Sequence, residues 1–352
     1  MKKIISLLLV MILMLSCGVC ALASDSSQDY ENELNLRKDY ENTPGNPSKV
    51  NPFRDSLKVV GNVVYMKYEK FYAVVDFLGV DEDGNYVEKI VVPKKIDSLP
   101  VKWVIYLDHY YFEEHGFSND SIKEIVLPDT IEYIGDYAFW RHTKARVTHI
   151  PNKINTIGSY SYLARNRKKI VLPATATEIA KDAFAESETL EKITFPKKVT
   201  TIPSGVLSYC KSLKKVTFKG KIKKIGTMAF DYCTNLQSIT IPKTVKKIGK
   251  AAFKDCKNLK KITIPKNVEK INSVTFGGCK ELSKVVFKGY ECPKIDTFKP
   301  FKNTKKGIRF QVRTRAIAKE LKAELKNSGV RKAKIYVGDK LIYKNITDDY
   351  WR

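Results

Sequence analysis

The chain is 352 residues long and 43% hydrophobic, which is enough to build a core and excludes a wholly disordered protein. Lysine and arginine number 63 against 38 acidic residues, giving a formal net charge of +25. This excess predicts attraction to anionic surfaces and says nothing about the fold.

Residues 1–23 have the features of a secretory signal peptide. They begin with two lysines, continue as an unbroken apolar run and end in Ala-Leu-Ala, so we expect cleavage after Ala23. Two alternatives stay open, a spanning anchor and a lipoprotein modified at Cys17. No other apolar run approaches the roughly 20 residues that cross a bilayer. We therefore expect a secreted or cell-surface protein without a transmembrane segment in the mature chain.

Two short segments precede the main part of the chain. Residues 24–56 are polar, rich in Asn, Ser and Asp, and lack apolar periodicity, which predicts a flexible linker. Residues 57–85 contain alternating strand-like runs and end in the turn sequence DEDGN. This pattern predicts an N-terminal β-hairpin cap.

From residue 86 to residue 298 a single period dominates. An isoleucine recurs about every 23 residues, and an aromatic or apolar residue follows it five positions later. The isoleucines are Ile134, Ile157, Ile179, Ile202, Ile225, Ile248 and Ile271, and the second series is Phe139, Tyr162, Phe184, Leu207, Phe230, Phe253 and Phe276. All spacings are 23 except one of 22. A fixed period in this range is typical of solenoids and other repeat architectures.

One copy shows how each unit is built. In LKKITIP, residues 259–265, Ile262 and Ile264 alternate with Thr263, which predicts a short strand with one buried face that ends at Pro265. A second extended piece and a tight turn that buries Phe276 follow. Each unit is too thin to bury its own apolar residues, so the copies must stack, with parallel strands about 4.8 Å apart.

The C-terminal residues 299–352 predict a βαβ cap. Ile317, Leu321 and Leu325 recur at four-residue spacing on an otherwise charged helix, and Gly329 follows as a stop. Because the end of a solenoid exposes an apolar cross-section, a cap of this kind is needed for solubility.

Four cysteines occupy the same place in consecutive copies: Cys210, Cys233, Cys256 and Cys279. Stacking brings them within disulfide range, but their Cβ vectors run parallel, so we favour buried free thiols and leave the redox state open. Four thiols in a straight row cannot surround a metal ion tetrahedrally, so we expect no metal site. Cys292 is left over as a candidate free thiol.

The pattern A-F-x-x-C-x-x-L-x-x-I-x-I-P-x-x-V-x-x-I-G, found at 229–249 and nearly repeated at 252–272, resembles the BspA-like class of bacterial leucine-rich repeats. The resemblance runs from about residue 61 to residue 337. It implies a leucine-rich repeat solenoid of short parallel β-strands with an N-terminal β cap and a C-terminal α/β cap, and an association with adhesion and with host or matrix contact. Early copies depart from the pattern: the Cys position holds His142, Arg165 and Ser187, and the corner glycine is Ala180, Pro203 and Asn272 in three copies.

The sequence contains no recognisable catalytic or phosphate-binding motif. His109 and His115 lie close to acidic residues and allow a metal or acid–base cluster, but without a defined ligand spacing we favour an irregular insertion. We therefore expect no cofactor, no metal and no enzymatic activity. Tyr110 and Tyr111 are candidate contact residues in this segment, and we expect Trp103 in the core.

Lysine dominates the later copies. From Glu191 to Tyr290 there are 23 lysines, no arginine and five acidic residues. The candidate ligand-binding residues are Lys192, Lys214, Lys215, Lys260, Lys261 and Lys284, with the strand threonines Thr194, Thr217, Thr240 and Thr263 as a companion row. We expect them to form one positive face that binds by its electric field, because bidentate recognition favours arginine.

Three functions can be compared on this basis. The favoured hypothesis is a non-enzymatic extracellular or cell-surface binding or adhesion protein whose lysine face contacts acidic glycans, wall polymers or proteins. Nucleic acid is not expected, because no aromatic residues interleave with the lysines. The alternative is a structural or spacer module without its own ligand, and the third hypothesis is an enzyme centred on His109 and His115. Ligand identity and oligomeric state stay undetermined.

Overall fold

The structure is a computed structural model that describes residues 57–79, 85–106, 121–140, 144–330 and 332–346. The predicted signal peptide 1–23 with Cys17, the linker 24–56, and His109, Tyr110, Tyr111 and His115 lie outside the described residues. All described residues except Leu57 belong to one compact unit.

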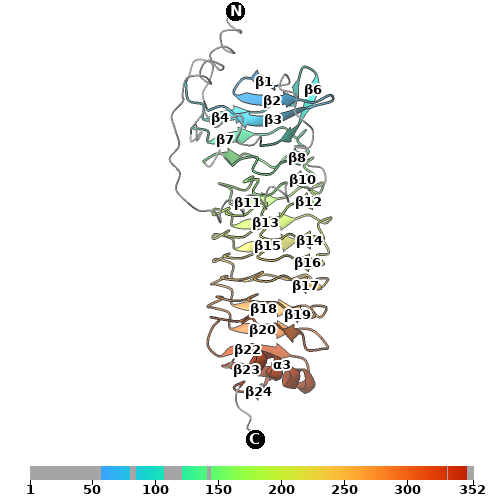
Figure 1. The fold of residues 1–352 in the computed structure, drawn as a ribbon, viewed down its shortest axis with the longest axis vertical. Coiled ribbons are helices and arrows are strands. Elements are labelled where there is room, and N and C mark those ends of the chain that lie inside the picture. The colour runs from blue at the N-terminus through green and yellow to red at the C-terminus, as the bar shows by residue number, and fades with distance from the viewer. Residues whose placement is uncertain (1–56, 80–84, 107–120, 141–143, 331, 347–352) are drawn as a thin grey trace, which may run out of the picture. The chain divides into compact units, whose positions relative to one another are not determined.

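One side of this unit is built from a stack of strands that are three or four residues long, apart from the two-residue β9 (Figure 1). They are β4 (Lys89–Val91), β7 (Glu124–Val126), β9 (Arg146–Val147), β11 (Lys169–Val171), β13 (Lys192–Phe195), β15 (Lys215–Phe218), β18 (Lys261–Ile264) and β20 (Lys284–Phe287). Every pair among these strands is parallel, and the β13–β15 register pairs residues that are 23 apart in sequence, as in Ile193 with Val216. The predicted parallel solenoid with a period of about 23 residues is therefore confirmed.

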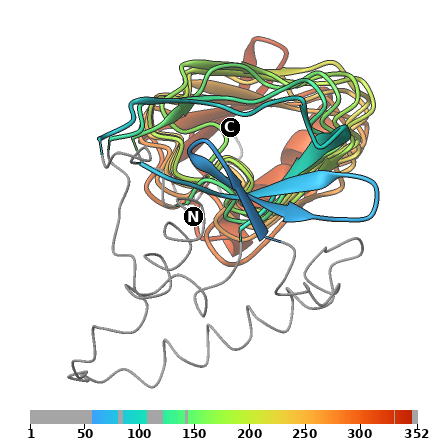
Figure 2. The same cartoon turned by 90° about the horizontal axis from the view of Figure 1, so that it is seen from above.

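A second side carries two-residue strands at the isoleucine corner of each copy. They are β8 (Tyr133–Ile134), β10 (Thr156–Ile157), β12 (Glu178–Ile179), β14 (Thr201–Ile202), β16 (Lys224–Ile225), β17 (Lys247–Ile248), β19 (Lys270–Ile271) and β21 (Lys294–Ile295). These strands also pair in parallel, in register with their equivalents in neighbouring copies. Figure 2 shows the successive coils superposed when the unit is seen from above.

The third side consists of stacked turns joined by backbone hydrogen bonds. Phe230 N donates to Ala252 O at 2.9 Å, and Phe253 N donates to Thr275 O at 2.9 Å. These turns need left-handed backbone: Tyr232 has φ 56° and Gly278, two copies later, has φ 75°. The turn side is thus a third ladder, although its residues are not strands.

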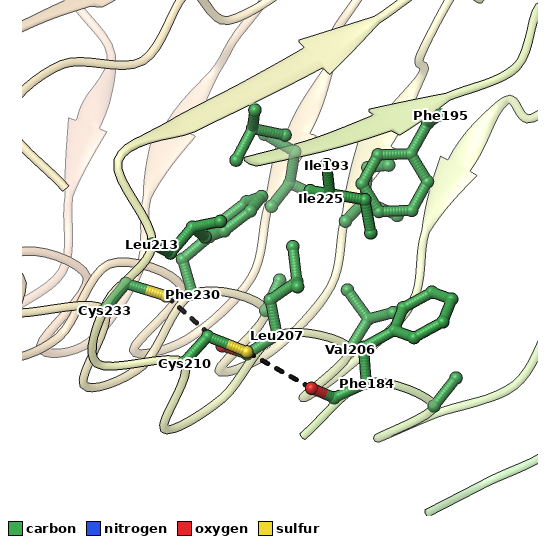
Figure 3. Packing of buried hydrophobic residues seen from close by; sticks show 14 of the residues in the cluster. Phe184, Ile193, Phe195, Val206, Leu207, Cys210, Leu213, Ile225, Phe230 and Cys233 are labelled. Carbon is green, nitrogen blue, oxygen red and sulfur yellow. Dashed lines mark hydrogen bonds between the residues drawn. The ribbon is translucent and has the colours of Figure 1, made fainter. Parts of the chain in front are cut away.

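The interior is filled by one set of apolar side chains per copy (Figure 3). Phe230, Phe253 and Phe276 are fully buried and stack with ring centroids 5.2 and 5.6 Å apart. Ile262 and Ile264 are buried whereas Thr263 is only half-buried, as the strand alternation predicts. Burial of each side chain of this size stabilises the fold by about 1.5–3 kcal/mol, so each copy contributes a similar share of the stability of the core.

The corner glycines allow the copies to approach one another. A Cβ at Gly249 would lie 2.4 Å from Thr227 N and 2.5 Å from Gly226 C, both backbone atoms of the preceding copy. Where the next copy carries Asn272 instead, the Asn272 amide donates to Ile248 O at 2.6 Å. The substitution therefore exchanges close packing for a hydrogen bond.

The N-terminal strands continue the sheet of short strands. β1 (Leu57–Val60), β2 (Val63–Lys67) and β3 (Tyr72–Phe77) are consecutive neighbours, β2 and β3 being antiparallel. β3 then pairs in parallel with β6 (Leu99–Val104), which pairs with β5 (Lys95–Ile96) and β8. That these strands act as a cap stays a proposal.

The C-terminal residues form a βαβ unit. β22 (Ile308–Val312) and β23 (Ala333–Val337) are parallel and joined by α3 (Arg315–Asn327), and β24 (Lys340–Tyr343) is antiparallel to β23. Thr314 caps the helix by accepting from Ile317 N at 3.3 Å, and Gly329 follows its end with φ 79°. The predicted apolar stripe of α3 is buried.

Candidate functional site

The long strands place basic side chains in register at their first or second position. Lys169, Lys192 and Lys215 are paired across β11, β13 and β15, and a second run joins Lys261, Lys284, Arg309 and Lys334. The two runs are separated by the copy whose equivalent residue is the uncharged Ser238, which bridges to Lys261. We call the basic residues of the two runs the long-strand cation row. Of the predicted site residues it contains Lys192, Lys215, Lys261 and Lys284.

The row lies on the outer surface because the alternate strand positions face the core. Lys192, Lys215 and Lys261 are exposed and Lys284 is half-buried. Neighbours in register are about 5 Å apart, so each pair of ammonium groups repels by roughly 0.8 kcal/mol in water before salt screening. Among the described residues, none of these four lysines has an acidic group within ion-pair distance. The row is therefore a strip of uncompensated positive charge.

The other predicted residues lie beside this row. Lys214 is exposed but is partly neutralised by Glu191, 3.0 Å away, and this hydrogen bond lowers the pKa of Glu191. Lys260 is also exposed. The companion threonines are in register between Thr194 and Thr217, while Thr263 faces Val286 and Thr240 lies outside the named strands.

The first copies differ in charge balance. There the equivalent strand position holds Lys89, Glu124 and Arg146, and Glu124 lies 3.9 Å from Lys89 and 2.7 Å from Arg146. Lys123 is paired with Glu88 in the same region. At this strand position, uncompensated charge therefore begins at Lys169 and continues toward the C-terminus.

A second row was missed by the sequence reasoning, which expected a single lysine face. Lys224 and Lys247 are in register on the short strands, as are Lys270 and Lys294, and all four are exposed. We call them the short-strand cation row. Only Lys270 has an ion pair among the described residues, with Asp296 at 3.3 Å. The signal was present, because a lysine precedes the corner isoleucine in these copies.

Trp103 corrects another expectation. It is half-buried on β6 and lies outside the fully buried core. Its ring centroid lies 4.3 Å from that of Phe71, 5.2 Å from that of Tyr68 and 5.6 Å from that of Tyr133. These rings form an aromatic cluster on the outward side of the strand. The core position next to it is taken by Val104.

The cysteine ladder consists of buried free thiols, as favoured from the sequence. Each Sγ donates a weak hydrogen bond to a carbonyl of the preceding copy: Cys210 to Phe184 at 3.2 Å and Cys233 to Leu207 at 3.2 Å (Figure 3). Burial raises the pKa of the Cys210 thiol to about 12. The thiols therefore satisfy backbone acceptors and are not poised as nucleophiles.

Metal-binding clusters and membrane-crossing helices are both absent from the described residues. No group of three or more His, Cys, Asp or Glu side chains there could hold a metal ion. Nor is any helix in that part of the chain both long and apolar enough to cross a membrane.

The geometry defines a class of protein: a repeat solenoid that presents extended surfaces, a type of fold that typically serves as a binding scaffold. The family model described as BspA type leucine rich repeat region matches residues 110–237 and 223–308 in six copies. These matches span more than half of the chain, so the chain belongs to the BspA type leucine rich repeat family, and the family prediction is confirmed.

Two of the similar solved structures are informative about the fold. A leucine rich cell surface protein from Faecalibacterium prausnitzii A2-165 is 22% identical, with a TM-score of 0.50, covering 66% of this chain and 70% of that chain. A leucine-rich repeat protein from Bacteroides ovatus ATCC 8483 is 19% identical, with a TM-score of 0.54, covering 72% and 70%. At these identities the likeness supports the fold alone. A comparison with curated proteins finds no match.

Proposed function

We propose that this chain is a non-enzymatic, exported or cell-surface binding protein that uses its long-strand cation row to contact anionic macromolecules. One observation carries the proposal: basic side chains from successive copies stand in register, and at this strand position the described later copies have no acidic partner equivalent to Glu124. A polymer with regularly spaced negative charges, such as an acidic glycan or a wall polymer, complements such a strip.

The mode of recognition follows from the residue type. Lysine is a compact, strongly hydrated charge on a flexible stem and provides no rigid fork for bidentate contacts. The row should therefore bind by summed Coulomb attraction, with modest shape selectivity and a strong dependence on salt. The half-buried threonine hydroxyls beside it would add hydrogen bonds to a polymer lying across the strands.

Export is supported by the features of residues 1–23, and the similar F. prausnitzii protein is described as a cell surface protein. Mass spectrometry of the mature N-terminus tests this part directly. We expect the chain to begin at Ser24, whereas a lipid-modified Cys17 would show that it is membrane-anchored.

The binding proposal is tested by reversing charge on one row at a time. The first variant changes Lys192, Lys215, Lys261 and Lys284 to Glu, and the matched control changes Lys224, Lys247, Lys270 and Lys294 to Glu. Both variants alter the net charge equally, and repulsion between neighbouring lysines is replaced by similar repulsion between glutamates. Elution from immobilised heparin in a salt gradient is then compared.

We expect the first variant to elute at clearly lower salt than the control. Equal loss in both would show that only net charge matters and would contradict a specific face. No retention of the unaltered protein at any salt would instead favour the alternative, a structural or spacer module without a ligand of its own.

A further inference from the structure

A groove interrupts the turn side of the solenoid. It has a volume of about 430 Å³ and is lined by Arg165 and Asn166 from one turn, Glu186, Glu188 and Thr189 from the next, and Tyr209 and Lys211 from the third. None of these residues belongs to either cation row.

The groove arises where one turn is shorter than the next. From Tyr162 to Ile170 the chain advances eight residues, but from Phe184 to Ile193 it advances nine, although Ile170 and Ile193 are strand partners in register. The shorter turn cannot follow the path of its neighbour, and a gap opens between them.

The turn ladder breaks at the same place. Glu186 N donates to Ser208 O and Tyr209 N donates to Asp231 O, both at 2.8 Å, so the later turns are joined. By contrast, Arg165 N and Arg167 N bond within their own turn, to Tyr162 O and Ala164 O. Among the described backbone hydrogen bonds, none links residues 163–167 with residues 185–189.

Two buried polar atoms without a hydrogen-bond partner mark this break. They are Arg167 Nε in the shorter turn and Ser187 Oγ in the next. Ser187 is 1% exposed and occupies the position of the ladder cysteines, whose thiols each find a carbonyl in the preceding copy. Ser187 has no such acceptor, so the local structure departs from optimal packing beside the groove.

The lining of the groove is polar, aromatic and balanced in charge. The Arg165 guanidinium lies 4.1 Å from the Tyr162 ring centroid, and Lys211 is paired with Glu188 at 2.6 Å. Tyr209 is 43% exposed, and its ring stacks on Tyr232 at 4.7 Å with an interplanar angle of 5°. Two cations and two carboxylates thus surround a supported aromatic ring.

We propose that this groove binds a neutral, hydroxyl-rich saccharide unit. Carboxylates of Glu186 and Glu188 can accept hydrogen bonds from sugar hydroxyls, while Arg165 and Lys211 can donate to the sugar oxygens. The Tyr209 ring, held in place by Tyr232, offers an apolar surface for the C–H groups of a pyranose. A polyanion gains nothing from the balanced charges, and an apolar ligand would strip water from four charged groups without compensation.

The test uses the full mature protein and four soluble neutral polysaccharides: mannan, galactan, xylan and β-glucan. Binding is measured at 0.5 M salt, because a screening length of only about a few ångströms then suppresses electrostatic attraction by the two cation rows. Three variants alter the groove: Tyr209→Ala removes the ring, Glu186→Gln removes an acceptor charge, and Thr189→Tyr fills the groove from an exposed position. Tyr290→Ala removes a 68% exposed tyrosine outside the groove lining and is the matched control.

We expect at least one polysaccharide to bind at this salt concentration, with affinity about tenfold weaker in each groove variant and unchanged in Tyr290→Ala. Far-UV circular dichroism confirms that the variants are folded. Absence of binding to all four polymers, or binding that the three groove variants leave unchanged, would overturn the proposal. Failure of the lysine proposal would not affect this result, because the two experiments use opposite salt conditions and different residues.

Discussion

Asp231 offers the sharpest test of the packing described above. Its side chain is only 6% exposed, its nearest cation is Lys254 Nζ at 3.8 Å, and Asp231 Oδ1 accepts no hydrogen bond. Burial, more than any neighbouring charge, raises the pKa of this carboxyl from 3.8 to about 6. The perturbation is Asp231→Asn, which keeps the shape and removes the charge.

The magnitude follows from linkage. A folded-state pKa above the unfolded value means that the ionised carboxylate destabilises the fold, and a shift of about two units corresponds to about 3 kcal/mol. This cost is absent below pH 3.8, grows between pH 3.8 and 6, and is complete above pH 6. The stability difference between Asp231→Asn and the unaltered protein should therefore change by about 3 kcal/mol in favour of the variant between pH 3.5 and pH 7.5.

Urea unfolding followed by far-UV circular dichroism at both pH values measures this change. Any constant effect of the amide cancels, because only the change between the two pH values is compared. Asp339→Asn, at an exposed position, controls for loss of one negative charge. If the difference for Asp231→Asn is the same at pH 3.5 and pH 7.5, the argument that burial governs this carboxyl is wrong.

Two other predictions concern the stacking. Gly249→Ala should lower the free energy of unfolding, measured with urea, by about 1–3 kcal/mol, because its Cβ would lie 2.4 Å from a backbone atom. The control Gly277→Ala, whose Cβ would have no contact below 3.3 Å, should lower it by less. Equal losses of stability in the two variants would contradict the close-approach argument. The buried thiols of Cys210, Cys233, Cys256 and Cys279 should resist alkylation at pH 8 until the protein unfolds, whereas half-buried Cys292 should react first. Peptide mass spectrometry identifies which cysteines are labelled. Rapid labelling of Cys233 in the native protein would contradict the burial of these thiols.

The repeat and its strands were predictable because both depend on residues that recur in every copy. The alternation of Ile262, Thr263 and Ile264 fixes which side is buried, and the helix stripe at Ile317, Leu321 and Leu325 does the same for α3. A pattern repeated several times averages out local irregularities, so the period of the core could be recognised from the sequence alone.

The surface features were less predictable because each depends on a difference between copies. The groove follows from a single residue missing after Tyr162, and its effect appears only when the next turn is stacked on it. Trp103 was expected in the core, yet it is half-buried on β6, where its ring meets Phe71 and Tyr133. The short-strand cation row was not predicted, because its lysines recur with the same 23-residue period as those of the long strands, and only the path of the coil separates the two rows.

The register between copies also determines how the length of such a chain can change. The segments 229–249 and 252–272 are close to interchangeable, and each offers its neighbour the same phenylalanine, isoleucine and cysteine. Duplication of 23 residues would insert one further copy without disturbing the stacking of the copies on either side. It would usually add one lysine to the long-strand cation row and one to the short-strand cation row. The number of ligand-contacting copies can therefore change one copy at a time, whereas an insertion or deletion of any other length would disturb the stacking of neighbouring copies.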